Sequence, residues 1–83
     1  MTRDQIREKL AGIIKKETAY RGDVNDDMRL IEDIGADSLQ LMAIVTSAES
    51  SFKVTISDEA LLDIQRVGDA VDIIEAGLAT SQA

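Results

Sequence analysis

The sequence has 83 residues, a net charge of −7, and no histidine, cysteine or proline. The chain therefore cannot build a Ser-His-Asp triad, a Cys-His pair, an ordinary zinc site or a disulfide framework, and its negative charge argues against nucleic acid as a partner. No apolar run approaches the length of a membrane span and no signal peptide is visible, so we expect one cytoplasmic domain that does not insert into membranes.

A first helix is predicted over residues 3–18. Thr2 and Gln5 have the spacing of a capping box, in which each side chain bonds to the backbone of the other residue. Apolar side chains follow at helical spacing, with charged residues on the opposite face. This stripe is expected to face the core, and it consists of Ile6, Leu10, Ile13 and Ile14.

Residues 19–36 are predicted to be mostly loop, with turn residues at Asn25-Asp26-Asp27. Counting from Asp23, the sixth position of a calcium loop would need glycine but holds Met28, so we expect no metal site here. Three apolar residues are spaced to fix the loop onto the core, namely Leu30, Ile31 and Ile34.

Acidic residues crowd this loop and the start of the next element. We expect them to repel one another, so that salt or magnesium raises the melting temperature. The residues concerned are Asp23, Asp26, Asp27, Glu32, Asp33 and Asp37.

A second helix is predicted from Ser38 to Phe52, with Asp37 as its N-cap and Gln40 completing a capping box. Ser38 then takes the first helical position, near backbone N–H groups that have no partner within the helix. A helix N-terminus favours a bound phosphate through those donors and the helix dipole. The geometry suits a serine that carries a phosphate ester. It does not suit a catalytic nucleophile, because the nearest lysine in sequence, Lys53, lies at the far end of the same helix.

The second helix is apolar over more than one face. Its main stripe is predicted to be core, whereas Leu39 and Met42 lie to one side of it. Two interpretations of this pair remain open: burial in the most enclosed helix, or a face beside Ser38 that contacts a partner or ligand. The main stripe consists of Leu41, Ile44, Val45, Ala48 and Phe52.

A short third helix is predicted through Leu62, capped by Ser57 after an extended link at residues 53–56. A last helix begins at Val67-Gly68-Asp69, with Gly77 as its C-cap.

The predicted fold is all-α. It is an antiparallel four-helix bundle, with three longer helices and one short helix, and a long loop joins the first two. Residues 1–83 form a single domain, with a frayed tail at 79–83.

Two motifs in this setting resemble a known family. Gly35-Ala36-Asp37-Ser38-Leu39 opens the second helix after an acidic loop, and Val67-Gly68-Asp69-Ala70-Val71 opens the last helix. With the length and acidity of the chain, this combination over residues 2–78 resembles the acyl carrier proteins. The resemblance implies that a phosphopantetheinyl transferase attaches 4′-phosphopantetheine from coenzyme A to Ser38, with Asp37 and Leu39 flanking the attachment point.

The same resemblance implies a function without a catalytic residue. The thiol of the arm holds acyl groups as thioesters, and the protein supplies orientation and recognition. Acyl-transferring, ligase and synthase enzymes of fatty acid, specialised lipid or polyketide biosynthesis are the implied partners, and we expect a monomer that is not an enzyme. An alternative is a small helical interaction module with no prosthetic group.

The sequence also departs from the family pattern. Between residues 38 and 53 the only acid is Glu49, although family members carry several acids along this helix that enzymes read. We expect partner contacts at Gln40, Met42, Ala43 and Glu49. The weak charge favours a specialised pathway over general fatty acid synthesis. Two further departures concern local stability: Ser57 stands where proline is frequent, and Arg66 stands where a threonine cap is usual.

Overall fold

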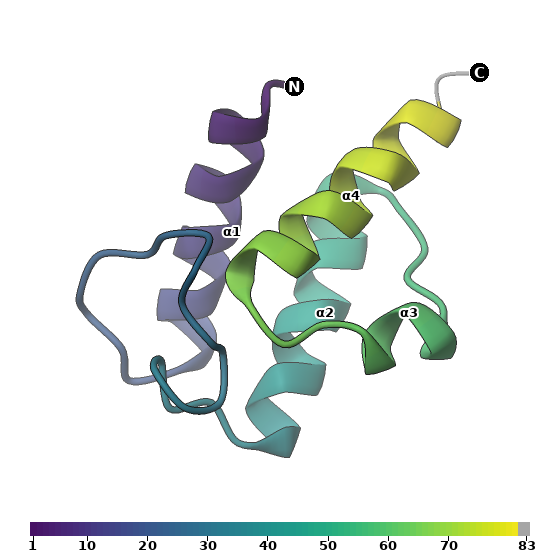
Figure 1. The fold of residues 1–83 in the computed structure, drawn as a ribbon. Coiled ribbons are helices and arrows are strands. Elements are labelled where there is room, and N and C mark those ends of the chain that lie inside the picture. The colour runs from purple at the N-terminus through teal and green to yellow at the C-terminus, as the bar shows by residue number, and fades with distance from the viewer. Residues whose placement is uncertain (82–83) are drawn as a thin grey trace.

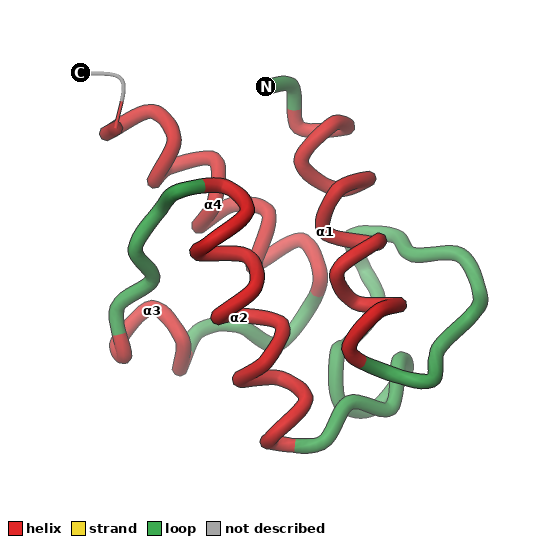
Figure 2. Tube along the Cα trace, turned by 180° about the vertical axis from the view of Figure 1, so that it is seen from behind, coloured by secondary structure: helices red, strands yellow, loops and turns green. Residues whose placement is uncertain are grey.

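The computed structural model describes residues 1–81, which form four helices: α1 (Arg3–Glu17), α2 (Ser38–Phe52), α3 (Asp58–Leu62) and α4 (Val67–Ser81). The three long helices pack together, and α3 lies in the connection between α2 and α4 (Figure 1). The residues between α1 and α2 form a long loop beside α1 (Figure 2). The predicted all-helical bundle is confirmed. None of the helices within residues 1–81 is long and apolar enough to cross a membrane.

Side-chain caps set the predicted helix starts. In α1, Thr2 Oγ1 accepts a hydrogen bond from the Gln5 N–H at 3.2 Å, and Gln5 Oε1 accepts one from the Thr2 N–H at 2.8 Å. The helix ends one residue earlier than predicted, at Glu17, and the Thr18 hydroxyl donates to the Ile14 carbonyl. Ser57 Oγ caps α3 by accepting from the Ala60 N–H at 3.1 Å. These bonds satisfy donors and acceptors that helix ends leave free.

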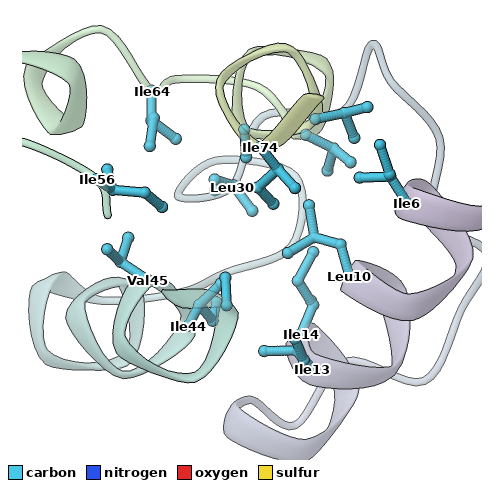
Figure 3. Close-up of a cluster of buried hydrophobic side chains, with 14 of the residues drawn as sticks. Ile6, Leu10, Ile13, Ile14, Leu30, Ile44, Val45, Ile56, Ile64 and Ile74 are labelled. Carbon is cyan, nitrogen blue, oxygen red and sulfur yellow. The ribbon is translucent and has the colours of Figure 1, made fainter. Parts of the chain in front are cut away.

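The core is aliphatic and closed. Leu10 and Leu30 point into its middle, where the long helices and the loop meet (Figure 3). A cavity enclosed among these side chains has a volume of only about 10 Å³, so it is at most the size of one water molecule. Besides Phe52, the buried apolar residues are alanine, valine, leucine and isoleucine. Such a core has no preformed space for a ligand.

The loop is fixed to the core by two of the three predicted residues. Leu30 and Ile34 are buried, but Ile31 is 57% exposed, so the prediction for Ile31 was wrong. The N–H groups of Asp33 and Ile34 both donate to the Arg29 carbonyl, which makes a helix-like turn. In such a turn residues four apart share a face, whereas the residue after the first points elsewhere.

The end of α4 also differs from the prediction. Gly77 is not a C-cap, because α4 continues to Ser81. A Cβ at Gly77 would lie 3.1 Å from Cβ and Cγ1 of Val54, so glycine lets the extended link approach α4 closely. Residues 79–81 are helical instead of frayed, and residues 82–83 of the expected tail lie outside the described residues.

Asp26 joins three segments of the chain. Its carboxylate accepts a hydrogen bond from Arg7 Nε at 2.6 Å and lies 3.4 Å from Arg3 Nη2, which connects the loop to α1. Its backbone carbonyl accepts from the Gly68 N–H at 2.9 Å, at the first turn of α4. A Cβ at Gly68 would lie 3.1 Å from that carbonyl oxygen, so glycine permits the approach. The hydrogen bond from Arg7 holds the pKa of Asp26 below its ordinary value.

The acidic loop does not consist of mutually repelling charges. Asp26 pairs with α1, Glu32 and Asp33 pair with Arg29, and Asp37 caps α2. The Arg29 N–H donates to Asp33 Oδ2 at 2.8 Å, and this bond lowers the pKa of that carboxyl. Within residues 1–81 no three potential ligands gather as a metal site would need. These four carboxylates therefore have partners within the fold, and the expected rise in melting temperature with salt or magnesium stays a prediction.

The contacts of Asp26 predict that substituting this residue lowers the stability of the fold. Asp26→Asn keeps the carbonyl that binds Gly68 but removes the charge that binds Arg7. We expect a loss of about 1 kcal/mol, because the ionic hydrogen bond is partly exposed. In a domain of this size, that loss lowers Tm by roughly 4–8 °C.

The pH dependence follows from the lowered pKa of Asp26. Its contribution is present above the unfolded-state pKa of about 3.9 and is lost as pH falls through the folded-state pKa. Thermal melts should therefore separate wild type from Asp26→Asn at about pH 7 and bring them together near about pH 2. Asp27→Asn is the matched control, because the Asp27 carboxylate forms no ion pair within residues 1–81. An equal loss of Tm in both variants would contradict this account.

Candidate functional site

The segment that leads into α2 consists of Gly35 and Ala36, and its backbone is bonded to the loop that precedes it. Gly35 has φ of 86°, a left-handed conformation that favours glycine. Ala36 is buried, and its N–H donates to the Leu30 carbonyl at 3.0 Å. The chain is thus fixed to the core immediately before the helix begins. The first turn of α2 then lies at the end of the molecule opposite the N-terminus (Figure 1).

The predicted capping box of α2 is present. Asp37 Oδ1 accepts from the Gln40 N–H at 2.7 Å, and Gln40 Oε1 accepts from the Asp37 N–H at 3.0 Å. The Asp37 carbonyl accepts from the Leu41 N–H at 2.9 Å and starts the helical hydrogen bonds. Asp37 and Gln40 therefore fix the turn of chain that holds Ser38 and Leu39.

Ser38 is exposed at the first position of α2. Within residues 1–81, no hydrogen bond engages its hydroxyl, its backbone N–H or the N–H of Leu39. The two N–H groups lie at the positive end of the helix dipole, where an anion is favoured. A phosphodiester on Ser38 would meet these donors and would displace no packed side chain. The residues present thus fit a phosphate-linked group.

The serine has no activating base. The chain contains no histidine, and Lys53 lies at the opposite end of α2 as its C-cap. A hydroxyl without a nearby base is a weak nucleophile. Histidine and lysine therefore do not activate the Ser38 hydroxyl.

The structure decides between the two interpretations of the apolar side face. Leu39 is 82% exposed and Met42 is 49% exposed, whereas Ile44, Val45 and Ala48 are buried. Leu39 and Met42 are therefore surface residues beside Ser38. Burial in the core was the wrong interpretation, and a contact face for a partner or ligand remains.

The other predicted contact residues have different surroundings. Gln40 completes the cap, and Ala43 is half-buried. Glu49 Oε2 accepts from the Ile56 N–H at 2.9 Å, and the Glu49 carbonyl accepts from the Val54 N–H at 3.2 Å. Glu49 thus holds the link that follows α2, a role that sequence reasoning missed because the partners lie in an irregular segment.

A shallow depression of about 130 Å³ lies one helical turn from Ser38. Its apolar lining consists of Leu30, Ile31, Leu41 and Ile64, and its polar residues are Arg29, Glu32 and Gln65. Leu41 and Ile64, together with Leu30, also line the small cavity of the core. The depression and the core are therefore separated only by aliphatic side chains. No local sequence signal identified this site, because it joins the loop, α2 and the link between α3 and α4.

Comparisons with known proteins agree with this geometry. The family model described as "Phosphopantetheine attachment site" matches residues 4–74. The acyl carrier protein of Tropheryma whipplei (strain Twist) is 35% identical over 80 residues, which cover 95% of this chain and 98% of the relative. The acyl carrier protein of Prochlorococcus marinus (strain MIT 9515) is 38% identical over 77 residues, covering 92% and 96%.

Solved structures show the same likeness. The acyl carrier protein from Enterococcus faecalis has a TM-score of 0.75 and 36% identity, covering 93% of this chain and 99% of that one. A hexanoyl acyl carrier protein from the actinorhodin polyketide synthase of Streptomyces coelicolor has a TM-score of 0.72 and 32% identity, covering 98% and 94%.

The cap beside Ser38 predicts a stability difference between two substitutions. Asp37→Ala removes the oxygen that accepts from Gln40 and should lower the unfolding free energy by about 1 kcal/mol. Asp37→Asn retains an accepting oxygen and should cost less. Urea denaturation followed by circular dichroism measures both. If the asparagine variant lost as much stability as the alanine variant, the cap would not be the cause.

Proposed function

The chain belongs to the acyl carrier proteins, which hold acyl groups on phosphopantetheine, and from this membership we propose that Ser38 is the residue that carries the arm. The observation behind the proposal is the exposed hydroxyl at the first position of α2, beside two N–H groups that donate no hydrogen bond within residues 1–81. Asp37 and Leu39 flank the serine: Asp37 fixes the helix start, and Leu39 offers an exposed apolar contact.

The attachment step is supplied by a phosphopantetheinyl transferase. A bond forms between Ser38 Oγ and the phosphorus that bears the pantetheine of coenzyme A, and the diphosphate bond of coenzyme A breaks. Adenosine 3′,5′-bisphosphate leaves, and a base of the transferase takes the serine proton, since this chain offers none nearby. The bound arm supplies a thiol that holds acyl groups as thioesters. The N–H groups of Ser38 and Leu39 would hold the phosphate oxygens of the arm.

The protein itself acts as a substrate and carrier. Acyl carrier proteins are carriers, and this chain provides no activated nucleophile or metal cluster within its described residues. The proposed partners are a phosphopantetheinyl transferase and the acyl-transferring, ligase or synthase enzymes that load and use the arm. We propose that the protein acts in the cytoplasm as a monomer.

The depression near Ser38 is the proposed entrance for the cargo. Its 130 Å³ approaches the roughly 150 Å³ of an engineered cavity that binds benzene, so the resting protein can receive only the first part of a chain. A longer acyl group must separate Leu41, Leu30 and Ile64 to enter the core. Aliphatic side chains make few directional contacts, which keeps the cost of such an opening modest.

We propose that the pathway is a specialised one. Along α2 the only acid after Asp37 is Glu49, and Ile56 occupies one of its oxygens. Enzymes that recognise acidic residues on the second helix would therefore find few charged contacts on α2. Hydrogen-bonding or small side chains replace it at Gln40, Ala43, Thr46, Ser47 and Ser50.

The attachment site predicts the outcome of a loading experiment. Incubation with coenzyme A and a broad-specificity phosphopantetheinyl transferase should add one phosphopantetheinyl group to the wild type. Ser38→Ala should abolish the gain while the helical spectrum is kept, because an exposed serine has little packing role. Ser50→Ala, an exposed serine on the same helix, should be loaded normally. Intact mass spectrometry measures all three. Modification of Ser38→Ala would overturn the assignment, and an unmodified wild type would favour an interaction module without a prosthetic group.

The neutral surface of α2 predicts poor use by general fatty acid synthesis enzymes. Placing glutamate at Ala43 and Ser50 should increase elongation by those enzymes. Exposed charge pairs contribute about 0–1 kcal/mol each, so the gain should reach at most about tenfold at low salt and shrink as salt rises.

Elongation rates of the wild type and Ala43→Glu/Ser50→Glu, compared at low and high salt, check this prediction. A strongly acidic carrier protein serves as the reference. Wild-type turnover equal to that reference, with no gain from the glutamates, would remove the argument for specialised partners.

A further inference from the structure

A groove of about 350 Å³ runs along the seam between α1 and α2. The two helices pack side by side, and no other part of the described chain crosses the seam in the view of Figure 2. Ile13 is the buried apolar residue of the groove. The other lining residues are polar or lack a side chain, namely Lys9, Gly12, Lys16, Ser47, Ser50 and Ser51. The lining thus includes no acid, although the protein has a net charge of −7.

Two lysines of α1 carry the positive charge of this groove. Lys9 and Lys16 are seven residues apart, which is about two helical turns, so they lie on one face of the helix. Neither forms an ion pair within residues 1–81. The acids next to them in sequence, Glu8 and Glu17, do not line the groove, and Glu17 accepts a hydrogen bond from the Ser47 hydroxyl at 2.7 Å. The groove is therefore a positive region on an acidic protein.

Lys9 is already held in place by α2. Its Nζ donates to the Ser51 carbonyl at 3.0 Å and lies 5.0 Å from the centroid of the Phe52 ring. An ammonium group has three donors, so two remain for a ligand. A lysine held in this way loses less side-chain entropy on binding a carboxylate than a freely moving lysine does. Lys9 is thus a preorganised cation, whereas Lys16 is exposed and makes no hydrogen bond through its side chain within residues 1–81.

Gly12 lies between the two lysines in the interior of α1, where glycine lowers helix stability relative to alanine. Packing does not require this glycine. Apart from its chain neighbours and the backbone of its own helix, a Cβ at Gly12 would meet no atom within 4 Å. Gly68 and Gly77 differ, because their Cβ positions would touch Asp26 and Val54. The missing side chain at Gly12 instead leaves the backbone of α1 open to close approach along the groove.

We propose that this groove binds an acidic segment of a partner protein, with one carboxylate at Lys9 and a second at Lys16. The two lysines are separated by a rise of about 10.5 Å along α1, and glutamates seven residues apart on a helix have the same spacing. A single phosphate would have to draw both side chains together, against the bond that holds Lys9 to α2. The hydroxyls of Ser50 and Ser51 make no hydrogen bond within residues 1–81 and can donate to the same carboxylates.

Charge complementarity favours a short acidic segment over other occupants. Two copies of this chain, each with a net charge of −7, repel each other at long range. Nucleic acid and anionic membranes meet the same repulsion, because they present their charge to the whole molecule. A segment that extends from a partner brings its carboxylates to the groove alone. Contacts between opposite charges of this kind set the encounter rate and the choice of partner.

The groove lies away from Ser38. Ser47 is the lining residue nearest to Ser38 along α2, and the nine residues between their positions correspond to a rise of about 13.5 Å. A partner segment in the groove therefore leaves Ser38 exposed. An enzyme that carries such a segment could hold this protein and act on its arm, since tethering gives an effective concentration of about millimolar. Binding in the groove does not itself depend on the proposed role of Ser38.

A peptide titration tests the charge of the groove. The probe is a helical peptide of alanine and glutamine with two glutamates seven residues apart, and the control peptide has glutamine in their place. NMR of the isotope-labelled protein should show amide shifts around the groove with the probe alone, and binding should weaken as salt rises. Lys9→Gln/Lys16→Gln should weaken binding about tenfold. Lys15→Gln/Arg66→Gln removes two other cations that form no ion pair, and should leave binding within about twofold of wild type.

Two further substitutions keep the test independent of the contacts of Lys9 with α2. Lys16→Gln alone should weaken binding about threefold, and it removes a side chain without a hydrogen bond or ion pair. Gly12→Leu should weaken binding by filling the groove, whereas Gly12→Ala should keep it. Both substitutions at Gly12 should maintain or raise Tm, because alanine and leucine favour a helix more than glycine does.

Several results would overturn the proposal. One is an equal effect of the two double variants, and another is a set of amide shifts that lies outside the groove. Inorganic phosphate that binds as tightly as the probe would make the groove a general anion site. A diffusion coefficient that falls with concentration in the wild type, but not in Lys9→Gln/Lys16→Gln, would make a second copy the occupant.

The role of Ser38 is tested separately from the groove. Lys9→Gln/Lys16→Gln should accept phosphopantetheine at the wild-type rate from a broad-specificity transferase, because the groove is remote from Ser38. Normal loading with no peptide binding would overturn the groove and leave Ser38 as the attachment site. Peptide binding by a wild type that is never loaded would support the groove and overturn the proposed function.

Discussion

The contacts of Asp26 are the constraint on which the arrangement of the other segments depends. Its carboxylate binds arginines of α1, and its carbonyl takes the Gly68 N–H of α4. The Met28 carbonyl takes the Val67 N–H two residues later. Because Arg66 cannot act as a side-chain N-cap, loop carbonyls and the Asp69 carboxylate satisfy the start of α4 instead. The long loop is therefore part of the helix packing.

The position of Ser38 also depends on these contacts of the loop with α1 and α4. Once the loop is fixed at residues 26–28, Leu30 enters the core, and its carbonyl takes the Ala36 N–H. Gly35 then turns the chain, and the capping box of Asp37 begins α2. A flexible loop would leave the first turn of α2 poorly placed. The tethered loop instead presents the serine on a rigid helix end, and no hydrogen bond within residues 1–81 engages its hydroxyl.

The charged residues divide into those that form contacts within the fold and those that remain unpaired within residues 1–81. Arginines make every ion pair found within residues 1–81, mostly with acids of the loop and α4. Lys9 instead holds the end of α2, donating to the Ser51 carbonyl and lying over the Phe52 ring. Most of the carboxylates are thereby engaged within the fold. The carboxylates of Asp58 and Glu59 in α3, and of Asp63 at its C-cap, form no ion pair or hydrogen bond within residues 1–81.

The sequence by itself determined the local features. The N-cap residues Thr2, Asp37 and Ser57 predicted where their helices begin, because a cap depends on residues only three positions apart. Apolar spacing identified the core faces of α1 and α2, and the motif around Ser38 indicated the family. These inferences needed no knowledge of distant segments.

Only the tertiary structure decided the roles that depend on distant partners. Gly77 looked like a C-cap until Val54 was seen to pack against it, and Asp26 looked like one of several repelling acids until Arg7 was found beside it. Leu39 and Met42 were ambiguous because helical spacing shows only which side of a helix a residue occupies. It does not show which sides are covered by other helices. Burial, pairing and close approach are properties of two segments together, so one segment's sequence cannot determine them.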